Sequence, residues 1–256
     1  MRAPDELREA VESYLGDLEL AQDLGRLEEA LRYALESGGK RIRPVLCLAV
    51  AEAAGGDLEK ALPAAAAVEL VHTFSLVHDD LPALDDDSER RGRPSAHVAF
   101  GEGVALLAGD ALLAEAMRLA LTYDDPAIAR ELVDATLGMI GGQHRDITGD
   151  DADLAGVERL KTGQLFSASV GLGLRAAGVL EQDQAAWRAF ADELGLLFQV
   201  VDDILDGDGF AERLGVEGAR RLADDAAGRA RERLEVIAAD TSVLRAVVDG
   251  LAVRSG

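Results

Sequence analysis

Cysteine, lysine and aromatic residues are scarce in this sequence, and each shortage is informative. A single cysteine, Cys47, among 256 residues excludes an intrachain disulfide framework. Aromatic residues make up only 4% of the chain, and alanine and leucine are abundant, which favours helices. No uninterrupted apolar run approaches the ~20 residues that span a bilayer, and the first residues lack the pattern of a secretory signal. We therefore expect a cytoplasmic protein without a stable membrane span.

Positive charge is also in short supply. The chain carries 48 acidic and 26 basic residues, for a net charge of −22. This argues against nucleic acid or an anionic membrane as the main partner, because both require a basic surface. Only three of the basic residues are lysines, and two of them, Lys40 and Lys161, lie in the glycine-containing segments "SGGKRIRP" and "RLKTGQL". These two segments are the first places to look for an anion site.

Helical spacing of apolar residues runs through the whole chain. A stripe of leucines from Leu24 to Leu35 ends at Gly38 and Gly39, and Pro44 is expected to open the next helix at its first position. The nearly uncharged segment 63–81 predicts a central, buried helix. Further helices are expected at 102–122, 126–142, 154–178, 184–206, 217–238 and 241–253.

No segment shows the alternation and β-branched enrichment of a strand, and no repeat or linker interrupts the pattern. The sequence therefore predicts an all-α fold, a bundle in which roughly eight to ten helices form one domain over residues 1–256.

Two aspartate-rich segments are the strongest chemical signal. The first holds Asp79, Asp80 and Asp85, followed by two more aspartates and then by Arg90, Arg91 and Arg93. The second, "FQVVDDILD", places Asp202, Asp203 and Asp206 on one face of an apolar helix, because they are spaced three and four apart. Carboxylates crowded together there repel one another and lose hydration, and a bound cation removes that cost. The alternatives are a solvated loop for the first segment and an exposed helix face for the second.

The type of ligand points to magnesium. Oxygen ligands without cysteine or suitably spaced histidine suit Mg²⁺, which usually bridges one or two carboxylates to substrate phosphates. Lys40, Arg41 and Arg43 follow a flexible glycine pair and could cover the remaining phosphate oxygens. His72 lies seven residues before Asp79, on about the same helix face, although a core histidine is the alternative. His78, His97 and His144 are expected to be structural.

Five motifs now occur in a recognisable order: "GGKRIRP", "HTFSLVHDDLPALDDDSERRGRPSAH", "GGQHRD", "KTGQLF" and "FQVVDDILD". Together they closely resemble the trans-type isoprenyl diphosphate synthases, the polyprenyl synthetases that make geranyl, farnesyl and geranylgeranyl diphosphate. The likeness runs from about residue 20 to residue 206. It implies an all-helical, Mg²⁺-dependent and usually homodimeric enzyme with its active site in a central helical cavity.

The resemblance also implies roles for individual residues. Those expected to hold Mg²⁺ and the allylic diphosphate are Asp79, Asp80, Asp85, Asp202, Asp203 and Asp206. Those expected to contact the allylic substrate are Arg90, Lys161, Thr162 and Gln199. Those expected to bind isopentenyl diphosphate are Lys40, Arg43, His72 and Arg91. The residues expected to carry catalysis most directly are Asp79, Asp80, Asp85, Lys161, Asp202 and Asp203. Gln143 and Asp146 resemble a supporting polar pair.

The implied reaction begins when metal ions and cationic side chains stabilise a departing diphosphate, so that the allylic carbon ionises. The double bond of isopentenyl diphosphate then attacks this carbon. Product length in the family depends on the residues five and four positions before the first aspartate, which here are Phe74 and Ser75. The bulky Phe74, with the two-residue insertion in "DDLPALD", resembles bacterial farnesyl synthases. We therefore expect the C15 product, with C20 as the alternative.

One departure from the family pattern keeps other interpretations open. After Asp206 the family usually has a lysine-containing loop, whereas no lysine follows Lys161 here; Arg213, Arg220 or Arg221 could substitute. The shortened loop favours one alternative, a catalytically weak subunit of a heteromeric synthase. A terpene cyclase or head-to-head synthase would need no isopentenyl site, and a structural acidic protein would leave the basic motifs unexplained.

Overall fold

A computed structural model describes residues 1–36, 38–149, 156 and 159–255. Its longer helices are α1 (Pro4–Gly16), α2 (Leu27–Leu35), α3 (Ile42–Ala53), α4 (Leu58–Asp79), α6 (Glu102–Ala120), α7 (Pro126–Thr148), α9 (Gln164–Ala176), α10 (Ala185–Asp206), α12 (Val216–Glu235) and α13 (Ser242–Ala252). Its short elements are helices α5 (Ala96–Phe100) and α11 (Gly209–Leu214), strands β1 (Glu89–Arg90) and β2 (Arg93–Pro94), and single turns at Gln22–Leu24, Arg159–Gly163, Glu181–Asp183 and Val253–Ser255. The predicted all-α fold is confirmed.

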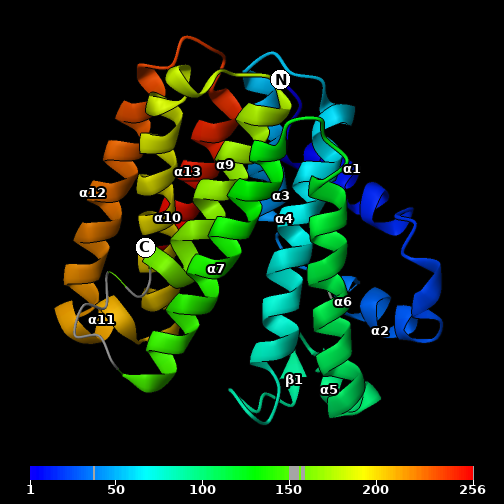
Figure 1. Ribbon diagram of the computed structural model, residues 1–256. Coiled ribbons are helices and arrows are strands. Elements are labelled where there is room, and N and C mark those ends of the chain that lie inside the picture. The colour runs from blue at the N-terminus through cyan, green and yellow to red at the C-terminus, as the bar shows by residue number, and fades with distance from the viewer. Residues whose placement is uncertain (37, 150–155, 157–158, 256) are drawn as a thin grey trace.

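Helix α4 forms the centre of the bundle, as predicted for residues 63–81. It packs against α3, α6 and α9, and α10 packs in turn against α9 and α12 (Figure 1). It starts earlier than expected because the side chain of Asp57 accepts a hydrogen bond from the Glu59 N–H and caps the first turn. Among the described residues α4 is long and apolar enough to cross a bilayer, but 72% of its most apolar window is buried in the bundle.

Several predicted boundaries differ from the structure. Pro44 is the third residue of α3, whose N-cap is Arg41, and Leu24 belongs to a separate 3₁₀ turn ahead of α2. Helix α7 continues six residues past the predicted end at 142, because it closes only where Gly149 adopts a left-handed conformation. The expected helix 154–178 contains a π-helical turn, Arg159–Gly163, before α9, while 154–155 and 157–158 lie outside the described residues.

A short hairpin was not expected, because two-residue strands carry no alternating pattern. Strands β1 and β2 pair in antiparallel register, Glu89 with Pro94 and Arg90 with Arg93. The two residues of the turn, Arg91 and Gly92, both have positive φ values, 55° and 77°, which is typical of a two-residue hairpin loop. The hairpin therefore presents Arg91 at its tip.

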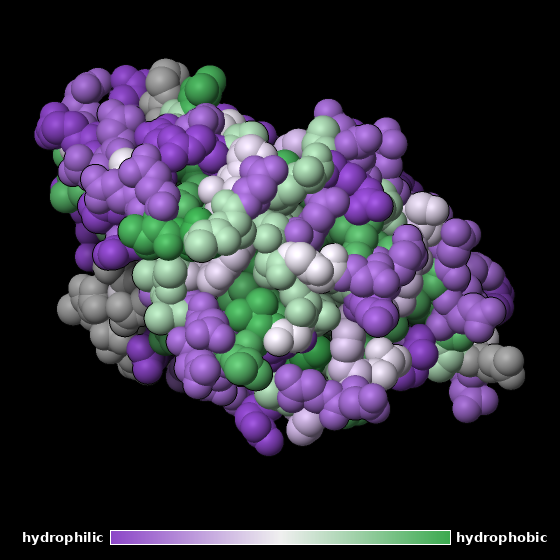
Figure 2. Space-filling view, turned by 90° about the horizontal axis from the view of Figure 1, so that it is seen from above, coloured by the Kyte–Doolittle hydropathy of each residue, from purple (hydrophilic) through white to green (hydrophobic). Residues whose placement is uncertain are grey.

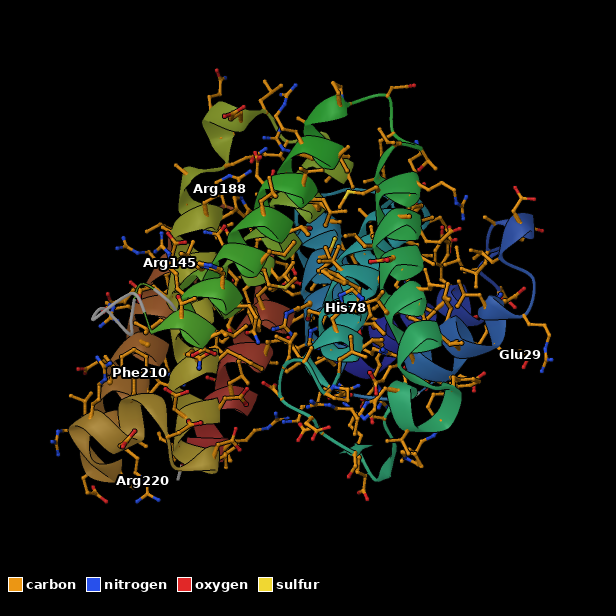
Figure 3. The ribbon with its side chains drawn as sticks, turned by 60° about the horizontal axis from the view of Figure 1, so that its bottom comes forward. Glu29, His78, Arg145, Arg188, Phe210 and Arg220 are labelled. Carbon is orange, nitrogen blue, oxygen red and sulfur yellow. The ribbon has the colours of Figure 1, made fainter. Side chains whose placement is uncertain are left out.

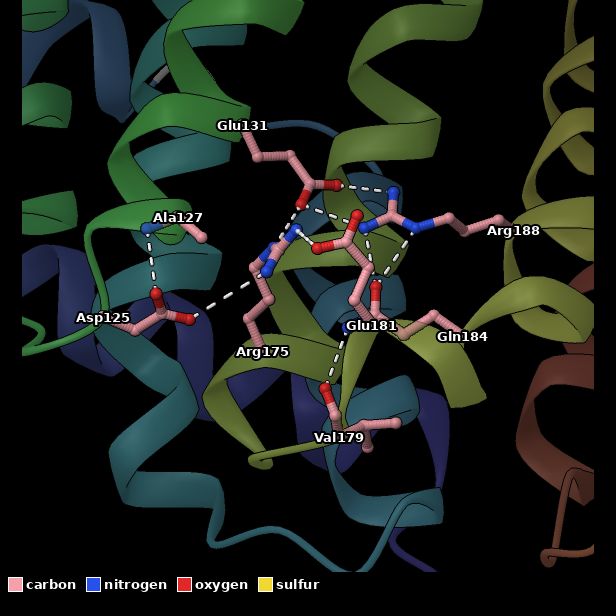
Figure 4. A network of polar contacts seen from close by, with 8 residues as sticks. All are labelled: Asp125, Ala127, Glu131, Arg175, Val179, Glu181, Gln184 and Arg188. Atoms are coloured by element: carbon pink, nitrogen blue, oxygen red, sulfur yellow. Dashed lines mark hydrogen bonds and ion pairs between the residues drawn. The ribbon is translucent and has the colours of Figure 1, made fainter.

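An ion-pair cluster joins helices α7, α9 and α10 (Figure 4). On each of these helices, taking α9 together with the turn before it, the cluster and the predicted site residues lie towards opposite ends. The carboxylate of Glu131 on α7 accepts from Nε of Arg175 on α9 at 2.6 Å and from Nη1 of Arg188 on α10 at 2.8 Å. Gly171 of α9 faces this carboxylate so closely that a side chain there would overlap it. The cluster fixes the relative positions of α7, α9 and α10, and hence of the site residues further along them.

Candidate active site

A cavity of about 830 Å³ opens between α3, α4, α7, α9 and α10. Its polar part is lined by Lys40, Arg43, His72, Asp79, Arg91, Gln143, Thr162 and Asp202. Its apolar part is lined by Phe74, Leu84, Met139, Ile140, Ile147, Leu165 and Phe198. The structure thus brings residues from all five sequence motifs to one cavity, including the predicted chain-length pair Phe74 and Ser75.

The glycine pair before Lys40 sets the direction of the basic side chains. Gly38 and Gly39 have φ values of 76° and 132°, which favour glycine. The guanidinium of Arg91 donates a hydrogen bond to the Gly38 carbonyl and lies against Gly39, where a Cβ would overlap it. The tip of the hairpin and the start of α3 therefore meet at the cavity.

Arg41 plays a different part from the other basic residues of its motif. Its guanidinium donates to Oε1 of Glu12 at 2.8 Å and to Oε1 of Glu69 at 2.6 Å, in an almost fully buried pair with Glu69. Nothing in the local sequence revealed these partners, since Glu12 and Glu69 lie 29 and 28 residues away. Arg41 therefore has a structural role: it fixes the start of α3, between Lys40 and Arg43.

Two polar atoms in the cavity are buried without a hydrogen-bond partner among the described residues: Nε of Arg43 and Oε1 of Gln143. The Arg43 guanidinium lies 4.8 Å from the ring centroid of Phe166 and 5.5 Å from that of Phe198. Burial lowers the pKa of Arg43, although Glu69 and Asp202 oppose the shift. Buried donors and acceptors are nearly always satisfied in native proteins, so these atoms indicate a polar ligand.

His72 lines the same part of the cavity and is kept neutral. Its pKa lies well below the ordinary value because of burial and then because of the nearby charges of Arg43, Arg91, Arg41 and Arg90. A neutral imidazole can donate one hydrogen bond and accept another without adding to the positive charge.

The two adjacent aspartates of each acidic motif differ in orientation. Asp79 and Asp202 line the cavity, whereas Asp80 and Asp203 are only 3% and 4% exposed. Nε of Arg90 donates to Oδ1 of Asp80 at 2.9 Å. Arg90 therefore holds an aspartate in place here, and contact with a substrate stays a prediction for it.

Asp203 is held in a similar way. It accepts hydrogen bonds from Nε2 of Gln199 at 2.6 Å and from the Phe210 N–H of α11 at 2.7 Å. Burial raises the pKa of both Asp202 and Asp203; the next contribution is repulsion from Asp206 for Asp202, and opposing hydrogen bonds from Phe210 and Gln199 for Asp203.

The remaining predicted ligands, Asp85 and Asp206, are exposed and do not line the cavity. Within the described ranges, no group of three or more histidine, cysteine, aspartate or glutamate side chains is placed to hold a metal by itself. The cavity does contain one carboxylate from each motif, Asp79 on α4 and Asp202 on α10, with cations beside them. This donor set suits an ion that completes its coordination with phosphate oxygens.

Some sequence-level expectations are changed by the structure. The side chain of Lys161 lies outside the described part of the chain, so its role stays a prediction. Arg220 is at the outer edge of the molecule, away from the central His78 (Figure 3), and pairs with Glu217 at 3.1 Å.

His78 and His144, expected to be structural, both line the cavity. The spacing of His78 four residues after Phe74 was the signal that could have revealed it.

Comparison with known proteins decides the family. A family model described as polyprenyl synthetase matches residues 25–224. The chain belongs to the polyprenyl synthetase family. The prediction from the five motifs, that the chain is one of the trans-isoprenyl diphosphate synthases, is confirmed.

Curated relatives of this polyprenyl synthetase carry two kinds of product name. A geranylgeranyl diphosphate synthase of Cyanophora paradoxa is 44% identical over 202 residues, which are 73% of this chain and 67% of that protein. A farnesyl diphosphate synthase of Geobacillus stearothermophilus is 40% identical over 227 residues, which are 82% of this chain and 76% of that protein. A heterodimeric geranylgeranyl pyrophosphate synthase large subunit of Arabidopsis thaliana is 45% identical, and the chain spans only 59% of its length.

Solved structures match over nearly the full length of both chains. The structure of a geranyltransferase from Legionella pneumophila has a TM-score of 0.91 at 34% identity, with 98% of this chain and 96% of that one covered. A geranylgeranyl pyrophosphate synthetase from Geoglobus acetivorans has a TM-score of 0.85 at 29% identity, with 97% and 98% covered. The fold is therefore that of the isoprenoid synthases.

Proposed function

We propose that this trans-prenyltransferase joins isopentenyl diphosphate to an allylic diphosphate in the 830 Å³ cavity and forms a short-chain prenyl diphosphate. One observation carries the proposal. Carboxylates from two helices, Asp79 and Asp202, share the cavity with Lys40, Arg43 and Arg91, and an apolar wall continues from them. Such a cavity accommodates a ligand that is anionic at one end and hydrocarbon at the other.

The carboxylates and the basic residues would bind different substrates. Asp79 and Asp202 would hold the allylic diphosphate through Mg²⁺, with Asp80, Asp85, Asp203 and Asp206 as further predicted ligands. When bound, Mg²⁺ would supply the positive charge that makes the diphosphate a good leaving group. Lys40, Arg43, Arg91 and the neutral His72 would bind the diphosphate of isopentenyl diphosphate. This division would keep the two diphosphates apart and their reacting carbons between them.

The chain's own groups can also protect the reaction. The apolar part of the cavity, with Phe74, Met139, Leu165 and Phe198 among its residues, would exclude water from an ionised allylic carbon. Thr162 and Gln143 lie at the same cavity and can donate hydrogen bonds to substrate oxygens. The side chains thus bind, orient and shield, while the proton released on carbon–carbon bond formation can leave with the diphosphate.

We infer farnesyl diphosphate, the C15 compound, as the main product. Phe74 supports this choice, because it lines the cavity on α4 and is only 6% exposed, so its ring would limit the length of the hydrocarbon chain. The relatives' names divide between farnesyl and geranylgeranyl diphosphate, so the C20 product is the second candidate. The comparison with the Arabidopsis large subunit keeps a heteromeric assembly as the alternative to a homodimer.

A homodimer is supported by apolar side chains on two neighbouring helices. Leu107 of α6 and Leu137 of α7 are 54% and 62% exposed, and one helical turn before each of them lies a second exposed apolar residue, Val104 or Val133. Single exposed apolar residues are normal on a protein surface, whereas groups of them mark contact sites for other proteins. The face seen from above has hydrophilic residues around most of its margin and a mixture of apolar and polar residues across its centre (Figure 2). One catalytic domain over residues 1–256, a cytoplasmic location and the absence of nucleic acid as a partner remain proposals.

An elongation assay tests the proposal. The chain is incubated with Mg²⁺, labelled isopentenyl diphosphate and each of the C5, C10 and C15 allylic diphosphates, and the products are separated by chain length. We expect a metal-dependent C15 product from the C5 and C10 substrates, and none with EDTA. Product of C20 or longer would contradict the role of Phe74 only. If isopentenyl diphosphate condenses with none of the allylic substrates, the proposed function is contradicted and the subunit alternative is favoured.

A further inference from the structure

His78 connects the cavity to the backbone of a neighbouring helix. Its imidazole lines the cavity and its side chain is 22% exposed. Nε2 lies 3.0 Å from the carbonyl oxygen of Leu106 on α6, at a distance where an Nε2–H donates a hydrogen bond to it. Figure 3 shows His78 in the central part of the molecule. The contact links α4, which carries His78, to α6.

Gly109 of α6 makes room for this imidazole. A Cβ at Gly109 would overlap the Nε2 and Cδ2 atoms of His78, so no other residue fits there without displacing the ring. The glycine is buried, and its φ is not in the left-handed region. Its small size is therefore required by His78 and not by the backbone. The carboxylate of the next residue, Asp110, lies 3.9 Å from Nε2.

The same imidazole lies against Phe74, one helical turn earlier on α4. The two ring centroids are 5.3 Å apart and the planes are inclined by 85°, an edge-to-face arrangement. An aromatic side chain on a helix has two common rotamers, and here the imidazole contacts both the Phe74 ring and α6. His78 thus prevents the Phe74 ring from moving towards Gly109.

We propose that His78 is a positioning residue for product length: anchored to Leu106 and seated on Gly109, it holds the Phe74 ring across the cavity. The inference deepens the proposed function and rests on it. Without the imidazole, the ring can move into the space beside Gly109, and the cavity lengthens towards α6. Product length would then depend also on Gly109 of α6, which does not line the cavity.

The test compares product lengths made by His78→Ala and by the wild type from the C10 substrate. We expect the ratio of C20 to C15 product to rise about threefold to tenfold, the factor that the loss of one hydrogen bond produces. In the double variant His78→Ala/Gly109→Ala the new methyl group fills part of the vacated space, so the ratio should fall back towards the wild type. His78→Gln, which keeps an amide donor at similar reach, should stay close to the wild-type ratio.

His97→Ala is the matched control, because His97 is a half-buried histidine that contacts Ser95 and does not line the cavity. An unchanged or lower ratio in His78→Ala would overturn the inference. If His78→Ala does not fold, His78→Asn, too short to reach Leu106, decides in its place: a wild-type ratio would overturn the inference, and a raised ratio would support it. A wild type that makes no product would instead refute the proposed function.

Discussion

Nη1 of Arg41 donates a 2.6 Å hydrogen bond to Oε1 of Glu69, in a pair whose side chains are 2% and 3% exposed. Burial opposes the charge of Arg41, yet its contacts with Glu12 and Glu69 leave its pKa above the ordinary value. Breaking a buried pair by removing one partner costs about 3–5 kcal/mol, because the other charge stays buried. Glu69→Gln should therefore lower the free energy of unfolding by about 3 kcal/mol, near the lower limit because Glu12 remains.

Chemical denaturation of Glu69→Gln and the wild type measures this difference. The control is Glu217→Gln, which removes a partner of Arg220 from a largely exposed pair and should change stability by less than about 1 kcal/mol. Equal losses in the two variants would show that burial of the Arg41–Glu69 pair does not matter.

The hydroxyl of Tyr123 is inserted into the hydrogen-bond ladder of α4. It accepts from the Ala64 N–H at 3.0 Å and donates to the Lys60 carbonyl at 2.5 Å, on either side of Pro63, which lies inside the helix. Tyr123→Phe leaves both backbone groups without this partner and should destabilise the protein by about 1–3 kcal/mol. Thermal unfolding of Tyr123→Phe beside Tyr33→Phe, which loses one exposed hydrogen bond to Pro94, checks this. A larger loss in Tyr33→Phe would contradict the account.

The buried His72 predicts a dependence of stability on pH. Its folded-state pKa lies well below the value of about 6.5 expected in the unfolded chain. The unfolded state therefore binds a proton first as the pH falls below about 6.5, and the folded state loses stability by up to about 1.4 kcal/mol per pH unit. Asp202 and Asp203 have raised pKa values and act in the opposite direction.

A comparison between variants isolates His72 from those aspartates. Between pH 7.5 and pH 5.5 the wild type should lose about 1 kcal/mol more than His72→Gln, which has no group to titrate there. Denaturant titrations at the two pH values measure both losses. Identical losses would mean that His72 is protonated in the folded protein as readily as in the unfolded one.

Much of the architecture could be predicted because its signals are local. The buried α4 follows from an uninterrupted apolar segment, and the shared face of Asp202 and Asp206 follows from helical spacing. The end of α7 was predicted too early, since Gly141 and Gly142 resemble a C-terminal signal although they continue the helix to Thr148. Glycine ends a helix only where its conformation changes, as at Gly149, and a sequence does not display that conformation.

Within the site, the sequence indicated which residues gather but not which way they turn. Asp79 and Asp80 are neighbours, and on a helix neighbours point about 100° apart, so the two side chains meet different surroundings. The orientation of Asp80 depends on Arg90, which holds it from the β-hairpin. The contacts of Arg41 with Glu12 and Glu69, and of His78 with Gly109, likewise join helices that are far apart in the sequence.

We propose that the carbon–carbon bond forms between Asp79 and Asp202. The most direct measurement is the rate of Mg²⁺-dependent condensation by Asp79→Asn and Asp202→Asn, with Asp86→Asn as the control. Asp86 is an exposed residue of the first motif with a φ of 53°, a conformation that asparagine tolerates, and it does not line the cavity. We expect each of the first two variants to lose at least about 100-fold in rate, as when a charge-stabilising group is removed from an active site, and Asp86→Asn to keep the wild-type rate. Near-wild-type rates in both Asp79→Asn and Asp202→Asn would contradict the account.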